Sequence, residues 1–120
     1  MQRTFIETEI FTKLIDNAGE KKLLGNIQLA VLLDLCLPIQ ERDVIKGSGG
    51  FVKLRVADTR NNKGKSGGFR IIYFDVPALG IVYLYLLYPK SVKDTLSSEQ
   101  LAVLKTASQE LKKWQAKKKS

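Results

Sequence analysis

The sequence contains no histidine, and this absence excludes several kinds of active site at once. Ser-His-Asp triads, metal sites built on imidazole and the histidine pair of familiar ribonucleases all require that side chain. The single cysteine, Cys36, excludes an intrachain disulfide and a cysteine-rich zinc site. Any catalysis by this chain must therefore use other residue types, and we expect no metal and no cofactor.

Long apolar segments are also missing. The longest apolar run, residues 27–37, is interrupted by Gln28 and Asp34 and is too short to cross a bilayer. The first ten residues lack a basic segment followed by an apolar stretch, so we expect no secretory signal, no membrane association and a cytoplasmic location. A hydrophobic content of 44% over 120 residues still suffices for one folded domain, residues 1–120, with a frayed basic tail at 116–120.

Acidic residues are scarce in the second half of the chain. Residues 46–93 carry nine basic side chains but only Asp58 and Asp75, a net charge of +7 out of +8 for the whole chain. A basic excess concentrated in one segment is typical of a surface that faces phosphates, and hence of nucleic-acid binding. Charge alone leaves an acidic membrane or an acidic protein partner as alternatives.

Hydrophobic periodicity and turn residues predict an α+β fold: a small antiparallel sheet with two N-terminal helices and a C-terminal helix. Residues 20–35 should form a mostly buried helix, and Ser97 with Gln100 matches a capping box at the start of the last helix. Residues 51–57, 69–76 and 81–88 should form an antiparallel meander. The remaining predicted elements are a strand at residues 3–7, a helix at 9–17 and a short extended segment at 43–45.

The glycine-rich loop between the first two strands of the meander contains Lys63 and Lys65. It is not a Walker motif, because Thr59 occupies the position of the first glycine and a strand follows instead of a helix. Exposed backbone N–H groups beside two lysines would suit a phosphate. The alternative is a hairpin tip that is merely solvated.

The neighbouring basic residues strengthen the phosphate hypothesis. Lys53 and Arg55 share one face of a strand, and Arg70 begins the next strand. Crowded cations lower the pKa of a lysine, which would let one act as a general base, while Arg70 could stabilise a pentacovalent phosphorane. When an RNA 2′-OH attacks the adjacent phosphate, the bond to the 5′-oxygen breaks. Lys90 and Lys93 could assist the departure of that oxygen.

Aromatic residues close to these cations could stack a base, and we expect Tyr88 and Phe69 to do so. Packing in the hydrophobic core is the alternative for each of them. For Tyr83 and Tyr85 we expect core packing.

Three motifs in the order found here resemble the RelE-like toxins of type II toxin–antitoxin modules, especially the HigB-type branch. The first is Gly-Ser-Gly-Gly before Lys-x-Arg on a strand (residues 47–55). The second is Gly-Lys-Ser-Gly-Gly-x-Arg-x-Ile-Tyr at the start of the next strand (residues 64–73). The third is a segment similar to Tyr-x-Lys-x-x-Lys-x-Asp-Leu (residues 88–96). The last one departs from the pattern through Thr95, inserted before Leu96, and through Pro89. The resemblance covers residues 2–112.

The resemblance implies a metal-independent endoribonuclease that cleaves mRNA in the ribosomal A site by attack of the RNA 2′-OH. It also implies a helix-turn-helix antitoxin as partner, and contact with operator DNA only through the antitoxin complex. Carried over by position, the expected catalytic residues are Arg70, Lys65, Lys63, Lys90 and Lys93, and the expected RNA-binding residues are Lys53, Arg55, Tyr88 and Phe69.

Two other functions remain open at this point. One is a protein of the same fold without nuclease activity that acts as a binding protein or corepressor. The other is a ParE-like toxin that acts on gyrase. The density of cations favours an RNA substrate, because a phosphate chain gives those charges a partner.

Overall fold

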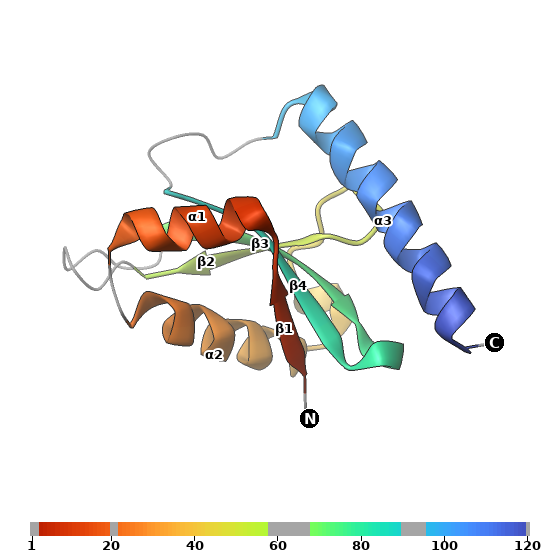
Figure 1. Cartoon of the computed structure of the whole chain (residues 1–120), viewed down its shortest axis with the longest axis horizontal. Coiled ribbons are helices and arrows are strands. Elements are labelled where there is room, and N and C mark those ends of the chain that lie inside the picture. The colour runs from red at the N-terminus through yellow and green to blue at the C-terminus, as the bar shows by residue number, and fades with distance from the viewer. Residues whose placement is uncertain (1–2, 20–21, 58–67, 90–95, 120) are drawn as a thin grey trace.

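The structure is a computed structural model that describes residues 3–19, 22–57, 68–89 and 96–119, with side chains as far as residue 113. Three α-helices and four β-strands confirm the α+β class (Figure 1). In chain order the elements are β1 (Thr4–Glu7), α1 (Glu9–Ala18), α2 (Leu23–Leu35), the 3₁₀ helix η1 (Ile39–Glu41), β2 (Val52–Val56), β3 (Phe69–Val76), the 3₁₀ helix η4 (Pro77–Leu79), β4 (Ile81–Pro89) and α3 (Ser98–Lys119).

The sheet has the strand order β1-β4-β3-β2. Strands β2, β3 and β4 form the predicted antiparallel meander. Strand β1 pairs with β4 in parallel, from Thr4 opposite Ile81 to Glu7 opposite Leu84, so the whole sheet is mixed. The helices α1 and α2 make this parallel pairing possible, because they carry the chain from one edge of the sheet to the other.

The helices cover the two faces of the sheet unequally. Helices α1 and α2 lie side by side over one face, and α3 lies on the other side of the sheet (Figure 1). Alternation along β3 separates the two cores: Ile71 and Tyr73 pack toward α1 and α2, and Ile72 and Phe74 pack toward α3. The face of the sheet that packs against α3 also carries the basic residues of β2.

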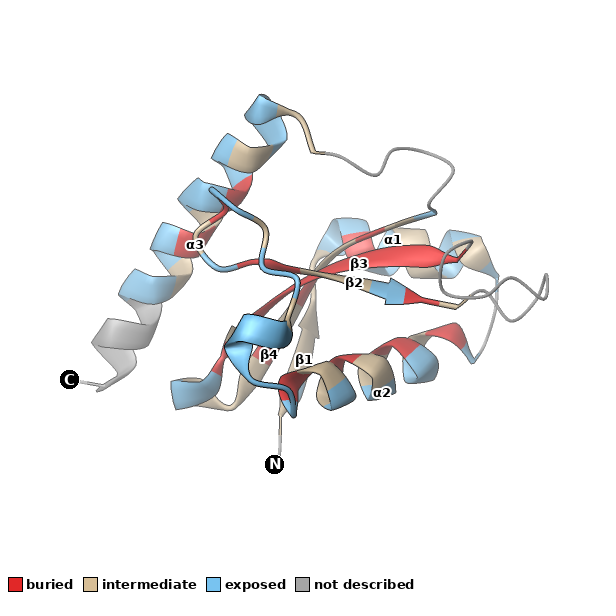
Figure 2. Cartoon of the chain, turned by 180° about the vertical axis from the view of Figure 1, so that it is seen from behind, coloured by how far each residue is buried: buried red, intermediate tan, exposed pale blue. Residues whose placement is uncertain are grey.

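Helix α2 differs from the mostly buried cylinder that its sequence predicts. Leu23, Ile27, Val31 and Leu35 form a buried stripe at four-residue intervals. Leu33 lies on another side of the helix and is 61% exposed, and exposed residues alternate with buried ones along the helix (Figure 2). One helix packed on one sheet buries only the stripe that faces the sheet, whatever the remaining residues are.

The Gly-Ser-Gly-Gly segment before β2 is a structural turn that holds α3. Ser48 is buried, and its hydroxyl donates to the carbonyl of Ile45 (2.7 Å) and accepts from the N–H of Phe51 (3.0 Å). Gly49 has φ +85° and lies so close to α3 that an added Cβ would be 2.0 Å from Oγ of Ser108. The segment therefore packs directly against α3.

The capping box at the start of α3 is confirmed, since Ser97 Oγ accepts from Gln100 N–H (3.1 Å) and Gln100 Oε1 accepts from Ser97 N–H (2.8 Å). Helix α3 continues to Lys119 and so includes most of the basic segment 116–120. Helix α1 ends at Gly19, which has the left-handed conformation (φ 68°) that favours glycine.

Candidate nucleic-acid interface

One row of side chains crosses the three antiparallel strands. Arg55 of β2 lies opposite Arg70 of β3, and Arg70 lies opposite Tyr88 of β4. Directly paired residues on neighbouring strands project to the same face, so the three side chains share the α3 side of the sheet. The structure thus brings together three of the residues that the sequence predicted for one site.

Lys53 lies in the next row of the same face, opposite Ile72. It is two positions from Arg55, or about 7 Å along the strand. A hollow of about 330 Å³ adjoins it, lined by Lys46, Asp43, Val44, Ile45, Leu96 and Leu101 besides Lys53. The walls of this hollow come from three separate segments, so no local sequence pattern predicts it.

The members of the row differ strongly in exposure. Arg55 is exposed and Lys53 is partly exposed, whereas Arg70 has no exposed surface. A ligand arriving from solvent can therefore reach Arg55 and Lys53 first. It can reach Arg70 only if the side chains that bury Arg70 move aside. The field of a charge is strongest where water is excluded.

The acidic residues of segment 46–93 do not neutralise this row where the structure describes them. Asp75 accepts from Nε of Arg3 (2.8 Å) and projects to the opposite face near the far end of β3. This hydrogen bond raises the pKa of Arg3, although burial opposes it. Asp58 lies outside the described residues. Asp75 is therefore paired with Arg3 and lies on the opposite face of the sheet from Arg55 and Arg70.

Phe69 is placed differently from the prediction. It precedes Arg70 on β3, so its ring projects to the opposite face, where it is 6% exposed and packs in the core with α1 and α2. A buried ring offers no face to a base, and we remove Phe69 from the site. Tyr83 and Tyr85 pack in the core on the α3 side, as predicted, and burial raises the pKa of Tyr83.

Lys63, Lys65, Lys90 and Lys93 lie outside the described residues. The strand ends to which their segments are joined are described, however. Val56 lies opposite Phe69, and Phe69 lies opposite Pro89. Segments 58–67 and 90–95 are thus attached at one end of the sheet, one row beyond Arg55, Arg70 and Tyr88.

Potential metal ligands are not clustered in the part of the chain that the structure describes: three or more Cys, Asp or Glu side chains never come together there in a way that would hold a metal ion. None of the described helices is both long enough and apolar enough to span a membrane.

A four-stranded sheet with helices on both sides and basic residues on one face defines a small α+β domain. The family described as the RelE toxin of the RelE/RelB toxin–antitoxin system matches residues 35–119, well over half of the chain. The protein belongs to the RelE toxin family. Members of this family are generally endoribonucleases, and membership implies an antitoxin partner.

Proposed function

We propose that this protein is a HigB-type toxin that cleaves mRNA on the translating ribosome, in the cytoplasm, without a metal ion. The observation that carries this proposal is the row of Arg55, Arg70 and Tyr88 on one sheet face. An RNA chain laid across this face would place a phosphate over Arg55 and a base beside Tyr88.

In the proposed reaction the 2′-oxygen of a ribose attacks the adjacent phosphorus, and the bond from phosphorus to the 5′-oxygen breaks. A lysine amine of the basic loop, Lys63 or Lys65, takes the 2′-hydroxyl proton. Lys90 or Lys93 gives a proton to the departing 5′-oxygen. Arg70 stabilises the added charge of the phosphorane when the substrate has displaced the side chains that bury it. The products are a 2′,3′-cyclic phosphate and a 5′-hydroxyl.

We further propose that the antitoxin is a helix-turn-helix protein, and that the toxin reaches operator DNA only within the antitoxin complex. An antitoxin of this kind would explain how a cell tolerates a nuclease whose substrate is its own mRNA.

Expression of the chain in growing bacteria tests the proposed function. We expect growth arrest with mRNA cleaved at codons in the ribosomal A site. Arg55→Gln should weaken both effects without unfolding the protein, because Arg55 is exposed. The matched control is Lys13→Gln, an exposed cation on α1. Unimpaired growth with the intact chain would contradict the proposal, and arrest with DNA damage but intact mRNA would point to a gyrase toxin instead.

A further inference from the structure

Helix α2 and the turn that follows it carry an apolar stripe that the fold does not bury. Leu29 and Leu33 of α2, and Leu37 two residues past its end, are spaced four residues apart and are 59%, 61% and 40% exposed. Single exposed leucines are ordinary, but a contiguous apolar surface marks a place where something binds. The stripe is therefore a candidate interface of its own, separate from the cations of the sheet.

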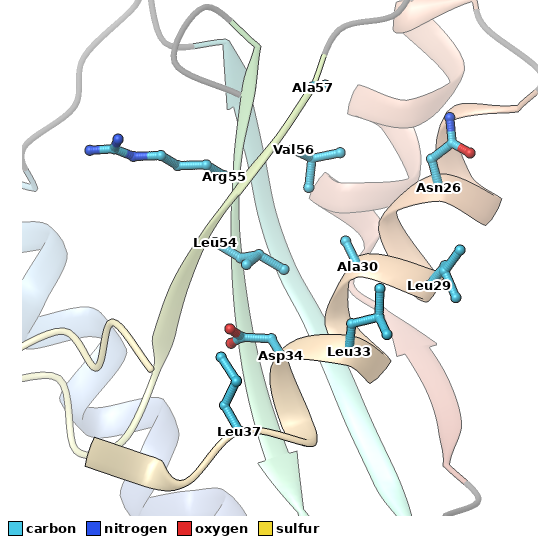
Figure 3. A pocket seen from close by; sticks show the side chains of 10 residues that line it. All are labelled: Asn26, Leu29, Ala30, Leu33, Asp34, Leu37, Leu54, Arg55, Val56 and Ala57. Carbon is cyan, nitrogen blue, oxygen red and sulfur yellow. The ribbon is translucent and has the colours of Figure 1, made fainter. Parts of the chain in front are cut away.

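A groove runs between this stripe and β2. It has a volume of about 420 Å³ (Figure 3). Its walls are residues 54–57 on one side and Asn26, Leu29, Ala30, Leu33, Asp34 and Leu37 on the other. Leu54 and Val56 point toward α2, and Arg55 points the opposite way (Figure 3). Most side chains that line the groove are thus apolar, with Asn26 and Asp34 as exceptions on α2, while the reverse side of β2 carries a cation.

The backbone of β2 provides hydrogen-bonding groups along the same groove. The N–H of Lys53 points away from β3, because it donates to the carbonyl of Asp43 (2.9 Å). Alternation along the strand directs the N–H and C=O of Arg55 to that same side. Strand β2 is the edge of the described sheet, and the described backbone pairing beyond it involves Asp43 and Val44 next to the first residues of the strand.

An edge strand beside an apolar groove fits an extended segment better than a helix, because a helix has no backbone groups left to pair with the strand. We propose that an extended segment of the antitoxin pairs with β2 at Arg55 and fills the groove as a fifth strand. Side chains on one face of this segment would be apolar and would contact Leu29, Leu33 and Val56. Those on the other face would lie beside Arg55 and would be acidic.

This arrangement would also regulate the site, a consequence that rests on the proposed function. Arg55 lies opposite Arg70, so a carboxylate beside Arg55 would occupy the place of an RNA phosphate. The bound strand would then block RNA by charge and position at once. An alternating pattern of apolar and acidic residues identifies the segment in the antitoxin sequence.

Leu29→Lys and Leu33→Lys test the groove, because both leucines are exposed and a lysine there leaves the core intact. The matched control is Val103→Lys on α3, where the valine is also 59% exposed. The probe is the purified antitoxin encoded with this chain. We expect each groove variant to bind it at least about tenfold more weakly, and the control to bind like the unchanged protein.

Amide hydrogen exchange at Arg55 tests the strand itself. We expect exchange of this N–H to slow by at least about tenfold when the antitoxin binds. Unchanged affinity in both leucine variants would overturn the proposal. So would binding that leaves the Arg55 amide unprotected, which indicates a helix in the groove. Protection that grows with the concentration of the chain alone would overturn it too, because the occupant would then be a second copy. These readouts need no RNA, so a failure to cleave mRNA leaves them interpretable.

Discussion

Arg55 and Arg70 face each other on neighbouring antiparallel strands, the first exposed and the second fully buried. Like charges on directly paired residues of neighbouring strands are unfavourable, and an anion bound beside them would reduce that repulsion. In the proposed function the two arginines have separate tasks, since the exposed one meets the RNA first.

The salt dependence of RNA binding should report this division. Arg55→Gln removes one exposed phosphate contact. We therefore expect the slope of log K against log salt to become less steep by the amount that corresponds to one phosphate contact. Titration of a fluorescent single-stranded RNA at several salt concentrations measures the slope. Lys13→Gln on α1 should leave it unchanged. Equal slopes for Arg55→Gln and the unchanged protein would show that RNA does not contact this face.

The close contact between Gly49 and α3 should make the stability of the protein sensitive to one added methyl group. Gly49→Ala places a Cβ 2.0 Å from Oγ of Ser108 and 2.8 Å from its Cβ, in a backbone with positive φ. We expect a loss of stability of at least about 2 kcal/mol, measured by urea unfolding, with faster amide exchange in α3.

Gly47→Ala is the matched control for this substitution. Its backbone has φ +82°, but a Cβ there meets nothing within 4 Å. We expect a cost of only about 1 kcal/mol, from backbone strain alone. If the two alanine variants are equally stable, the close approach of Gly49 to α3 does not matter.

The buried phenol of Tyr73 should make stability fall at alkaline pH. Burial and the hydrogen bond from its hydroxyl to Asp34 raise its pKa well above the ordinary value of 10.0. Above pH about 10 the phenol ionises in the unfolded chain but stays neutral in the folded one. The stabilisation is therefore complete below that pH and is lost as the pH rises.

Tyr73→Phe should flatten this dependence and cost about 1–2 kcal/mol at pH 7 through loss of the hydrogen bond. Urea unfolding between pH 7 and 10.5 measures both effects. Tyr83→Phe serves for comparison, because burial alone raises the pKa of Tyr83. Parallel curves for the unchanged protein and Tyr73→Phe would contradict this assignment.

Thr8 joins the start of α1 to β4. Its hydroxyl accepts from the N–H of Phe11 (3.1 Å) and donates to the carbonyl of Tyr85 (2.8 Å). Tyr85 lies within a register shift between β3 and β4, where Ile72 pairs with Leu86 and Tyr73 with Leu84. The hydroxyl therefore satisfies a carbonyl at an interruption of the ladder.

Thr8→Ala should cost about 1–2 kcal/mol, because it removes the helix cap and the bond to the bulge together. Thermal unfolding measures the loss. Thr12→Ala removes an exposed hydroxyl that bonds to Glu7, and we expect almost no change. A similar cost for both variants would mean that neither the cap at Phe11 nor the link to Tyr85 contributes to stability.

Strong local patterns predicted most of the fold. Alternation of Val52, Leu54 and Val56 with Lys53 and Arg55 predicted both the strand and its two faces, and Ser97 with Gln100 predicted the cap of α3. The parallel pairing of β1 with β4 could not be predicted, because it depends on contacts between residues about 77 positions apart.

The site was predicted only in part. Phe69 and Arg70 are consecutive residues of one strand, so the period of two already places them on opposite faces. The nearly continuous apolar sequence of β3 hid this signal. In α2, Leu29 and Leu33 look like core residues in the sequence, since hydrophobicity alone does not distinguish an internal contact from a contact with a partner.

The chemical nature of the cleaved ends tests the central claim most directly. A translation reaction programmed with one mRNA and supplied with the protein should yield fragments that end in a 2′,3′-cyclic phosphate and begin with a 5′-hydroxyl. Arg55→Gln and Arg70→Lys should slow their formation by at least about tenfold, and Lys13→Gln should not. Fragments with a 3′-hydroxyl and a 5′-phosphate, or translation halted with the mRNA intact, would contradict cleavage by 2′-hydroxyl attack on this face of the sheet.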